Sequence, residues 1–247
     1  MSANQAHRHS SSRHSSSQKP TSPSYKPPLT THPSATISES VSFQGTHPIS
    51  IGAGTVIHPR TKFISFEGPI KIGSGCIIGE KSIIGGPQTS PTPLTPTTRS
   101  IDTTTSITPT ATTIVTVVEN SVLIGPLVTI SAGTHISSAA TVDTAAILGQ
   151  RVRVGQHAKV CPGCCIPDDG VVDAWVVIWG GTGSGNRLQR RKRANGQQQQ
   201  HGDEAVPWFG LGGTVVEKGR LAVLEKEREG LTNLIGAVNI GGGARRK

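Results

Sequence analysis

Aliphatic residues recur at every sixth position over much of the chain. From residue 130 onward the series is Ile130, Ile136, Val142, Leu148, Val154, Val160, Ile166, Val172 and Ile178. Four residues after each of the first eight stands a small or modest side chain: Thr134, Ala140, Ala146, Val152, Ala158, Cys164, Gly170 and Val176. A helix needs apolar spacing near 3.6 and a plain strand needs strict alternation, so a period of six fits neither. It favours a short strand followed by a corner, repeated three times per turn of a triangular coil.

The same pattern occurs earlier, in two copies that begin 21 residues apart: PISIGAGTVIHPRTKFI from Pro48 and PIKIGSGCIIGEKSII from Pro69. Large apolar residues stand at Ile51, Ile57, Phe63, Ile72, Ile78 and Ile84, and small ones at Thr55, Thr61, Cys76 and Ser82. Because one coil takes 18 residues, we expect Ile130 to stack against Leu148, at the interstrand distance of about 4.8 Å. Glycines directly after an aliphatic are expected at corners that need a positive φ or close backbone approach: Gly52, Gly73, Gly79, Gly85, Gly149 and Gly155.

These patterns divide the chain into a solenoid and its appendages. We predict an all-β solenoid over residues 32–181, with about six or seven coils. Residues 1–31 are Ser/His-rich with scarcely any large apolar group, so we predict a disordered tail. A Thr/Pro-rich loop over 86–113 interrupts the solenoid, and the basic, Gln-rich stretch 182–206 is predicted to be a disordered linker.

Residues 207–240 are predicted to contain an amphipathic helix. Residues at three- and four-residue spacing form its expected packed face: Leu221, Leu224, Arg228, Leu231, Leu234 and Ile235. Gly219 and Gly230 weaken the helix. Pro207, Trp208 and Phe209 could fix the angle at which the chain enters it.

Composition narrows the classes of partner. The formal charge of +9 suggests a polyanion, but the charge is unevenly placed: no Asp or Glu precedes Glu39, and a basic run, RLQRRKR, spans residues 187–193. Both stretches are predicted to be disordered, and aromatic residues make up only 3% of the chain. Without aromatics for base stacking, we favour solvated tails over a nucleic-acid interface. We also expect no signal peptide, no membrane span and a reducing compartment, because the four cysteines do not form a disulfide scaffold.

Cysteine and histidine are the candidates for chemistry. CPGCC places Cys161, Cys164 and Cys165 at a spacing that in isolation suggests zinc. Cys164 falls on an inward small position and no second pair completes a tetrahedral set, so we favour packing over metal binding. His58 and His135 could each act as a general base on a loop, or could simply be polar residues at tolerant surface positions.

The repeats closely resemble the hexapeptide-repeat, left-handed parallel β-helix family, whose consensus reads aliphatic, Gly, two free positions, small residue, one free position. The resemblance implies a left-handed coil with a C-terminal α-helix packed back along it. Enzymes of this family are mostly acyltransferases or zinc-dependent carbonic-anhydrase relatives. The zinc enzymes carry an H-x4-H pair and an Arg-Gly-Asp turn. No two of the histidines His47, His58, His135 and His157 have that spacing, and Gln44 and Thr46 stand where the Arg and Asp would be.

A non-enzymatic branch of the family, the β-helical subunits of the dynactin pointed-end complex, resembles the chain more closely. The resemblance rests on an IHP-basic-x-basic pattern at Ile57 to Lys62 and a GP-I-x-IG-x-G pattern at Gly68 to Gly75. It implies a structural adaptor subunit for dynein-dependent transport on microtubules, in the cytoplasm and cytoskeleton. It also implies no catalytic, cofactor-binding or metal residues, and therefore no enzyme activity.

The implied partners are dynactin subunit 5, the pointed-end actin-related protein, other dynactin subunits and, indirectly, dynein cargo adaptors, with neither nucleic acid nor a membrane span. Trp175 and Trp179 could contact a partner, or could pack beneath the C-terminal helix. The alternative function is a homotrimeric acyltransferase or carbonic-anhydrase-like enzyme. Light scattering on the purified protein would separate a trimeric enzyme from an adaptor subunit.

Overall fold

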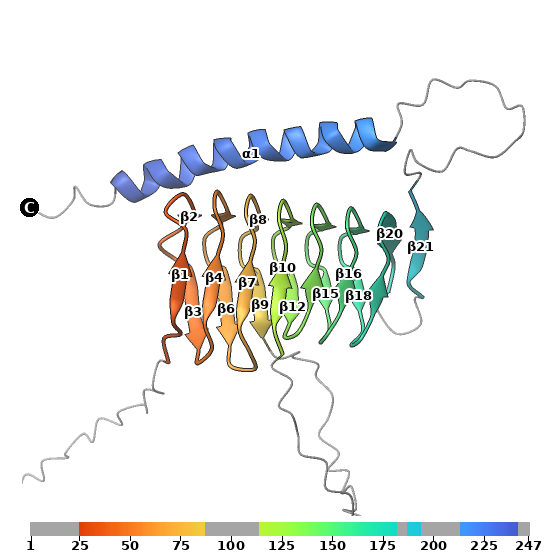
Figure 1. The fold of residues 1–247 in the computed structure, drawn as a ribbon, viewed down its shortest axis with the longest axis horizontal. Helices are drawn as coiled ribbons and strands as arrows, with labels where there is room; N and C mark the ends of the chain where they lie inside the picture. Colours follow the sequence, from red (N-terminus) through yellow and green to blue (C-terminus); the bar gives the residue numbers. More distant parts are fainter. Residues whose placement is uncertain (1–24, 87–113, 182–186, 194–212, 242–247) are drawn as a thin grey trace, which may run out of the picture.

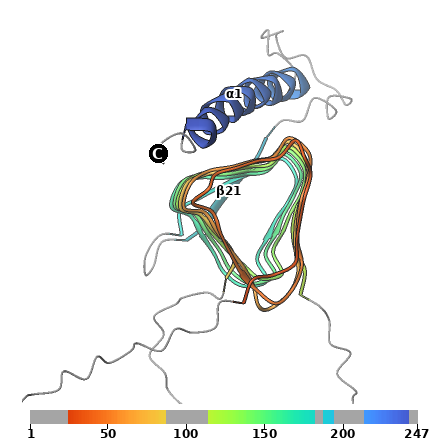
Figure 2. The ribbon, with the colours of Figure 1, turned by 90° about the vertical axis from the view of Figure 1, so that its left-hand side faces the viewer.

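The computed structural model describes residues 25–86, 114–181, 187–193 and 213–241. They form a left-handed parallel β-helix of about six turns, with one α-helix lying beside it (Figure 1). Viewed along its axis the coil is triangular, and each side of the triangle is one parallel sheet (Figure 2). The fold predicted from the six-residue period is therefore confirmed.

The three sheets, A, B and C, take every third strand of the chain. Sheet A contains β1 (Leu29–Thr31), β4 (Ile49–Ile51), β7 (Ile70–Ile72), β10 (Thr116–Val118), β13 (His135–Ile136), β16 (Arg153–Val154) and β19 (Val171–Val172). Sheet B contains β2 (Thr36–Ile37), β5 (Val56–Ile57), β8 (Ile77–Ile78), β11 (Leu123–Ile124), β14 (Thr141–Val142), β17 (Lys159–Val160), β20 (Val176–Trp179) and β21 (Gln189–Lys192). Sheet C contains β3 (Ser42–Gly45), β6 (Lys62–Ser65), β9 (Ile83–Gly86), β12 (Thr129–Ser131), β15 (Ile147–Leu148) and β18 (Cys165–Ile166).

The core is a column of stacked aliphatic side chains inside the triangle. Ile130 pairs with Leu148, and Leu148 pairs with Ile166, as the 18-residue period predicted. All three side chains are buried, and burying such a side chain stabilises the fold by roughly 1.5–3 kcal/mol. In the earlier block Ile49 pairs with Ile70, so the 21-residue copies also occupy successive turns.

The corners confirm the prediction for these glycines and show which of its two reasons applies at each. Among the six glycines that directly follow an aliphatic, only Gly85 has a positive φ. At Gly52, a Cβ would lie 2.6 Å from the carbonyl carbon of Gly73, so close packing of successive coils is what requires glycine there. The left-handed residue stands two positions later, and in the second block it is usually not glycine: Ser121, Leu127, Ala139, Ala145, Arg151, His157, Asp169 and Trp175.

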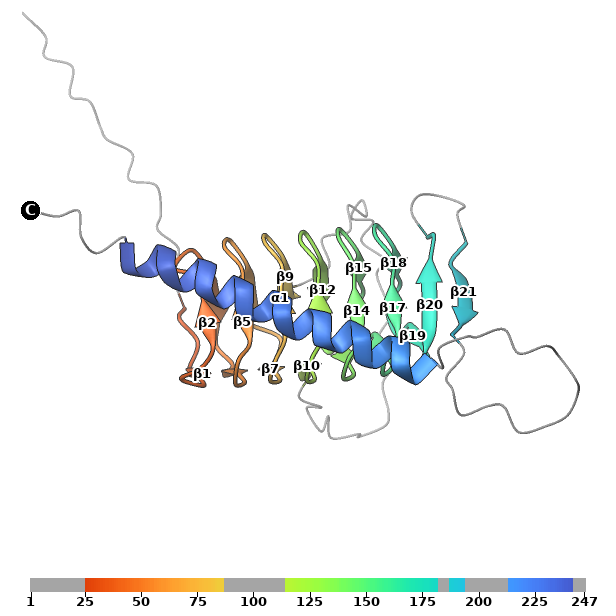
Figure 3. The same cartoon turned by 90° about the horizontal axis from the view of Figure 1, so that it is seen from above.

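Helix α1 (Gly213–Gly241) runs along the β-helix over the outer face of sheet B (Figures 1 and 3). It buries Leu224 and Ile235 against the outward side chains of that sheet, of which Val56 and Ile77 are fully covered. The prediction that Leu234 joins the packed face is wrong, because its side chain is 64% exposed. Ile235, one residue further on, takes the inward position instead.

Part of the predicted linker is ordered. Within 182–206, residues 189–192 form β21, which pairs antiparallel with β20 and places Arg191 opposite Val177. An edge strand needs backbone partners, and β21 supplies them to β20. The other described part of that range is Arg187, Leu188 and Arg193, and Leu188 packs against the end of the core.

The start of the solenoid lies slightly earlier than predicted, because β1 (Leu29–Thr31) belongs to the range assigned to the tail. Residues 1–24, 87–113 and 194–212 lie outside the described residues, and with them most of the predicted tail, loop and linker and the expected helix entry at 207–209. Among the residues that are described, no helix combines the length and the apolar character of a membrane span.

Candidate functional site

Two of the four histidines singled out from the sequence make contacts that hold the fold, and a third is half-buried. His47 Nδ1 lies 3.1 Å from the Ser65 carbonyl oxygen. His157 stacks on Trp175, with ring centroids 4.3 Å apart, and its Nδ1 lies 2.8 Å from Glu217 Oε1 of α1. His58 is half-buried, and burial lowers its pKa although the nearby Glu227 and Glu80 carboxylates act in the opposite direction. Among the described residues no hydrogen bond or ion pair orients the His58 ring.

His135 is different, because it stands on the open face of sheet A with a carboxylate partner. Its Nε2 lies 3.2 Å from Oε1 of Glu119, and the two side chains are 41% and 37% exposed. A carboxylate can only accept hydrogen bonds, so the ring nitrogen facing it carries the proton. The other nitrogen, Nδ1, has no hydrogen-bond partner among the described residues and can accept a proton from a bound molecule.

Ser138 fixes the Glu119 carboxylate in place. Oε2 of Glu119 accepts hydrogen bonds from the Ser138 hydroxyl at 2.7 Å and from the Ser138 backbone N–H at 2.9 Å. The Ser138 hydrogen bond lowers the pKa of Glu119 despite the opposing effect of burial, with a further contribution from His135. The carboxylate therefore stays ionised at neutral pH and holds the imidazole in one orientation, as the carboxylate of a catalytic triad does.

The 18-residue stacking brings this cluster together. Val117 on β10 pairs with His135 on β13, and Glu119 follows two residues after Val117 at the end of the same strand. The sequence analysis did not single out Glu119. A search for polar residues 16 to 20 positions apart, the neighbours across one coil, would have found the pair as a candidate.

A groove of about 400 Å³ lies at the other end of the same strands. It is lined by Ile114, Val115, Gly133, Arg151, Arg153, Asp169 and Val171. Arg153 also stands directly beside His135 in the sheet register. Because Val115 and Gly133 precede β10 and β13 while Glu119 follows β10, His135 lies between its carboxylate partner and the groove.

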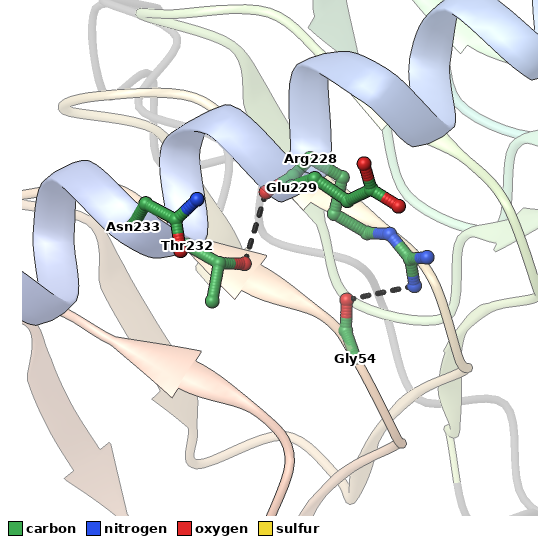
Figure 4. Close-up of a pocket in the computed structure, with 5 residues that line it drawn as sticks. All are labelled: Gly54, Arg228, Glu229, Thr232 and Asn233. Carbon is green, nitrogen blue, oxygen red and sulfur yellow. Dashed lines mark hydrogen bonds between the residues drawn. The ribbon is translucent and has the colours of Figure 1, made fainter.

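A second hollow, of about 340 Å³, lies between α1 and a corner of the coil (Figure 4). Its lining includes Arg228, Glu229, Thr232 and Asn233 from the helix, and Gly54 from the corner. The Arg228 guanidinium donates to the Gly54 carbonyl oxygen at 3.2 Å, and the Thr232 hydroxyl donates to the Arg228 carbonyl oxygen at 2.9 Å. The lining contains no histidine, and its arginine already docks the helix. We therefore assign this hollow to the attachment of α1.

The cysteines behave as packing residues. Cys76 and Cys164 are buried inside the coil, and burial raises the pKa of the Cys76 thiol to about 11. The Cys76 thiol donates to the Glu119 carbonyl oxygen at 2.9 Å. Within the described ranges no three His, Cys, Asp or Glu side chains gather as a metal site would require.

The two tryptophans have different surroundings. Trp175 is half-buried and stacks on His157, which in turn contacts Glu217 of α1, so Trp175 belongs to the attachment of the helix. Trp179 is 38% exposed at the end of β20. Its expected contact with a partner stays a prediction.

No protein-family model and no curated protein matches the chain. Solved structures do match. A putative acetyltransferase from Bacillus cereus gives a TM-score of 0.56 at 14% identity, covering 85% of this chain and 92% of that chain. A hexapeptide transferase family protein from Anaplasma phagocytophilum gives 0.53 at 13% identity, covering 87% and 98%. At these identities the likeness shows the fold.

These neighbours contradict the sequence-based assignment of a non-enzymatic adaptor. The resemblance seen in the sequence was to dynactin subunit 6, whereas two solved structures that share this fold over most of both chains are named as a transferase and an acetyltransferase. The predictions of an adaptor function and of no enzyme activity are therefore corrected. Those predictions rested on a resemblance in the repeats and considered each histidine alone, so they did not take into account the pairing of His135 with Glu119 across one coil. The dynactin partners and the cytoskeletal location stay predictions that no observation bears on. In its fold, the chain is similar to bacterial hexapeptide transferases.

Proposed function

We propose that the chain is an acyltransferase, which moves an acyl group from a thioester donor to a hydroxyl or amine acceptor. The observation that carries the proposal is the His135–Glu119 pair, an imidazole oriented by an ionised carboxylate on an open face. The fold supports it as well, because the two neighbours that match most of the chain are named as an acetyltransferase and a transferase.

The arrangement fits general-base catalysis of acyl transfer. The acceptor oxygen or nitrogen donates a proton to His135 Nδ1 as its lone pair attacks the thioester carbonyl carbon. Collapse of the tetrahedral adduct breaks the carbon–sulfur bond, and the imidazolium returns the proton to the departing thiolate. The ionised Glu119 stabilises the imidazolium while it carries the additional proton. The ester or amide and the free thiol are the products.

The test is acyl transfer from acetyl-coenzyme A to a panel of amines, amino acids, sugars and their phosphates, followed by thiol release. Positioned general bases contribute roughly 10²–10⁴-fold to rate, so His135→Ala should lower kcat by at least roughly a hundredfold. The matched control is His32→Ala, which removes an exposed histidine bonded only to Ser34 in the described structure. It should leave kcat unchanged.

Glu119→Gln gives a second readout, because the amide can still accept from the ring but cannot stabilise an imidazolium. We expect a lower kcat with the fold intact, because the imidazolium formed during the reaction loses its ionised partner. Full activity of His135→Ala would overturn the proposal, as would absence of thiol release with every acceptor. Light scattering should show a homotrimer, and a stable monomer would count against an enzyme of this fold.

A further inference from the structure

Resting on the acyl-transfer proposal, we infer that the acceptor carries an oxyanion, a carboxylate or a phosphate, which binds Arg153 beside His135. The inference names a class of acceptor and a specificity residue. It follows from the position of Arg153 in sheet A, from its lack of a partner and from the groove that it borders.

Arg153 is the next outward side chain along sheet A from His135. The two residues pair across β13 and β16, and adjacent strands of a sheet lie about 4.8 Å apart. On the other side of His135 the register continues through Val117 to Lys71, which is also exposed. The imidazole therefore lies in a row of outward side chains that includes a cation on either side and, within the row, no carboxylate.

The charge of Arg153 is uncompensated. Its side chain makes no hydrogen bond or ion pair with any described residue, although its backbone N–H donates to the Gly170 carbonyl oxygen. The nearby Arg151, by contrast, is paired with a carboxylate: its Nε and Nη2 lie 2.7 and 2.8 Å from the two oxygens of Asp169. The Arg153 guanidinium thus keeps its planar set of donors available, and this set matches the two oxygens of a carboxylate or phosphate.

The groove gives such a ligand a place to lie. Its volume of about 400 Å³ is suited to a small molecule, and Ile114, Val115 and Val171 supply apolar wall around the arginine pair. Asp169 is already bonded to Arg151, so the one acidic side chain of the lining does not oppose an incoming anion at Arg153. A compact skeleton with a single oxyanion fits this combination better than a neutral or cationic molecule.

The distance between Arg153 and His135 indicates that the oxyanion belongs to the acceptor and not to the acyl donor. A general base must lie within about 3 Å of the proton that it removes, so the acceptor nucleophile has to approach His135 Nδ1. Glu119 and Ser138 occupy the opposite side of the ring, which leaves the groove side for the acceptor. A group bound one strand away is a few bonds from that nucleophile, which is the distance within a small hydroxy acid, amino acid or sugar phosphate.

The first experiment measures anion binding without any chemistry. Protein with isotope-labelled histidine is titrated with inorganic phosphate and, separately, with acetate, and the His135 ring resonances are followed by NMR. We expect saturable shifts with at least one anion, and affinity weaker by roughly tenfold in Arg153→Gln. Arg60→Gln, which removes an exposed arginine paired with Glu80 on another face, is the matched control.

The second experiment compares acceptors that differ only in charge. Amino acids are compared with their amides, and glucosamine 6-phosphate with glucosamine, which separates carboxylate from phosphate recognition. Arg153→Gln should raise KM for the charged acceptor by roughly tenfold while leaving KM for the acyl donor unchanged, and Arg153→Lys should recover part of the loss.

The two proposals can fail separately. Anion binding that depends on Arg153, without acyl transfer, would overturn the acyl-transfer proposal and the assignment to an acceptor while leaving the anion site. Acyl transfer to neutral acceptors with no effect of Arg153→Gln would overturn the inference and leave the proposed function. Equal shifts in wild type and Arg153→Gln would show that the anions bind nonspecifically, which also overturns it.

Discussion

Sheets A and B are built from the same repeat, yet one carries the candidate site and the other is covered. The outward position of each strand directly precedes the buried aliphatic in both sheets. In sheet B these residues include Val56 and Ile77, at 0% and 2% exposure beneath α1. In sheet A they include Lys71, His135 and Arg153, which face away from any described element.

The difference shows that the inward positions fix the coil while the outward positions decide what each face does. An apolar outward row gains free energy when a helix covers it, whereas a row of charged side chains would have to be desolvated. The helix therefore packs on sheet B, and within the part of the chain that the structure describes no helix covers the imidazole and arginine of sheet A. Three sets of substitutions test this difference between the sheets.

The largest effect is expected when a charged residue, as found on the outer face of sheet A, is placed on the outer face of sheet B. Ile77→Lys places a charge on an outward position that is buried beneath α1, so we expect the free energy of unfolding to fall by about 2–4 kcal/mol. The helix should also dissociate from the coil, because a single helix has marginal stability in water without tertiary packing. Thermal denaturation and hydrogen exchange of α1 measure both effects.

The matched change on sheet A is Val171→Lys, at an outward position that is 53% exposed. We expect its unfolding free energy to change by no more than about 0.5 kcal/mol. Equal destabilisation by the two lysines would show that the two faces do not differ in the way described.

A second test concerns the carboxylate that attaches α1 at its N-terminal part. Burial opposes ionisation of Glu217, but hydrogen bonds from Arg220 and His157 outweigh it and lower the pKa of this carboxyl. Arg193 Nη1 also faces Glu217, at 3.7 Å from Oε2. A lowered pKa in the folded state means that ionised Glu217 stabilises the protein above its unfolded pKa of about 4.3. That contribution is lost as the pH falls through the lower, folded value.

Glu217→Gln should therefore cost about 1–3 kcal/mol at pH 7 and flatten the decline of stability below about pH 4.5. Urea denaturation across pH 3–7 provides the measurement. The same substitution at Glu225, an exposed residue of the helix, is the control. If the free energy of unfolding depends on pH in the same way in the Glu217 variant and in wild type, Glu217 does not link the helix to the coil electrostatically.

The smallest effects are expected at glycines. Nothing lies within 4 Å of a Cβ built at Gly219 or Gly230, so an alanine at either position should stabilise α1 by about 0.5–1 kcal/mol. Gly54 is the contrasting case, because its φ is +61° and a Cβ there would lie 2.5 Å from Nη1 of Arg228. Gly54→Ala should destabilise the protein, and similar melting temperatures for the three variants would contradict this docking of the helix.

The coil could be predicted from the repeat alone. A six-residue period with an 18-residue turn specifies which side chains enter the core, and the observed pairing of Ile130 with Leu148 follows from arithmetic alone. The period is sufficient because each coil contacts only its neighbours. Tertiary contacts in a solenoid therefore join residues at a fixed separation in the sequence.

The roles of the outer surfaces could not be predicted from the repeat. Glu119 and His135 are joined by side-chain directions on two coils, and the period gives no weight to polar residues that stack outside the core. The same holds for the choice of Ile235 over Leu234, because the helix faces the sheet with a rotation that small differences in packing select. Core positions recur at a fixed period and can therefore be identified in the sequence, whereas outward contacts depend on the geometry of a few individual side chains.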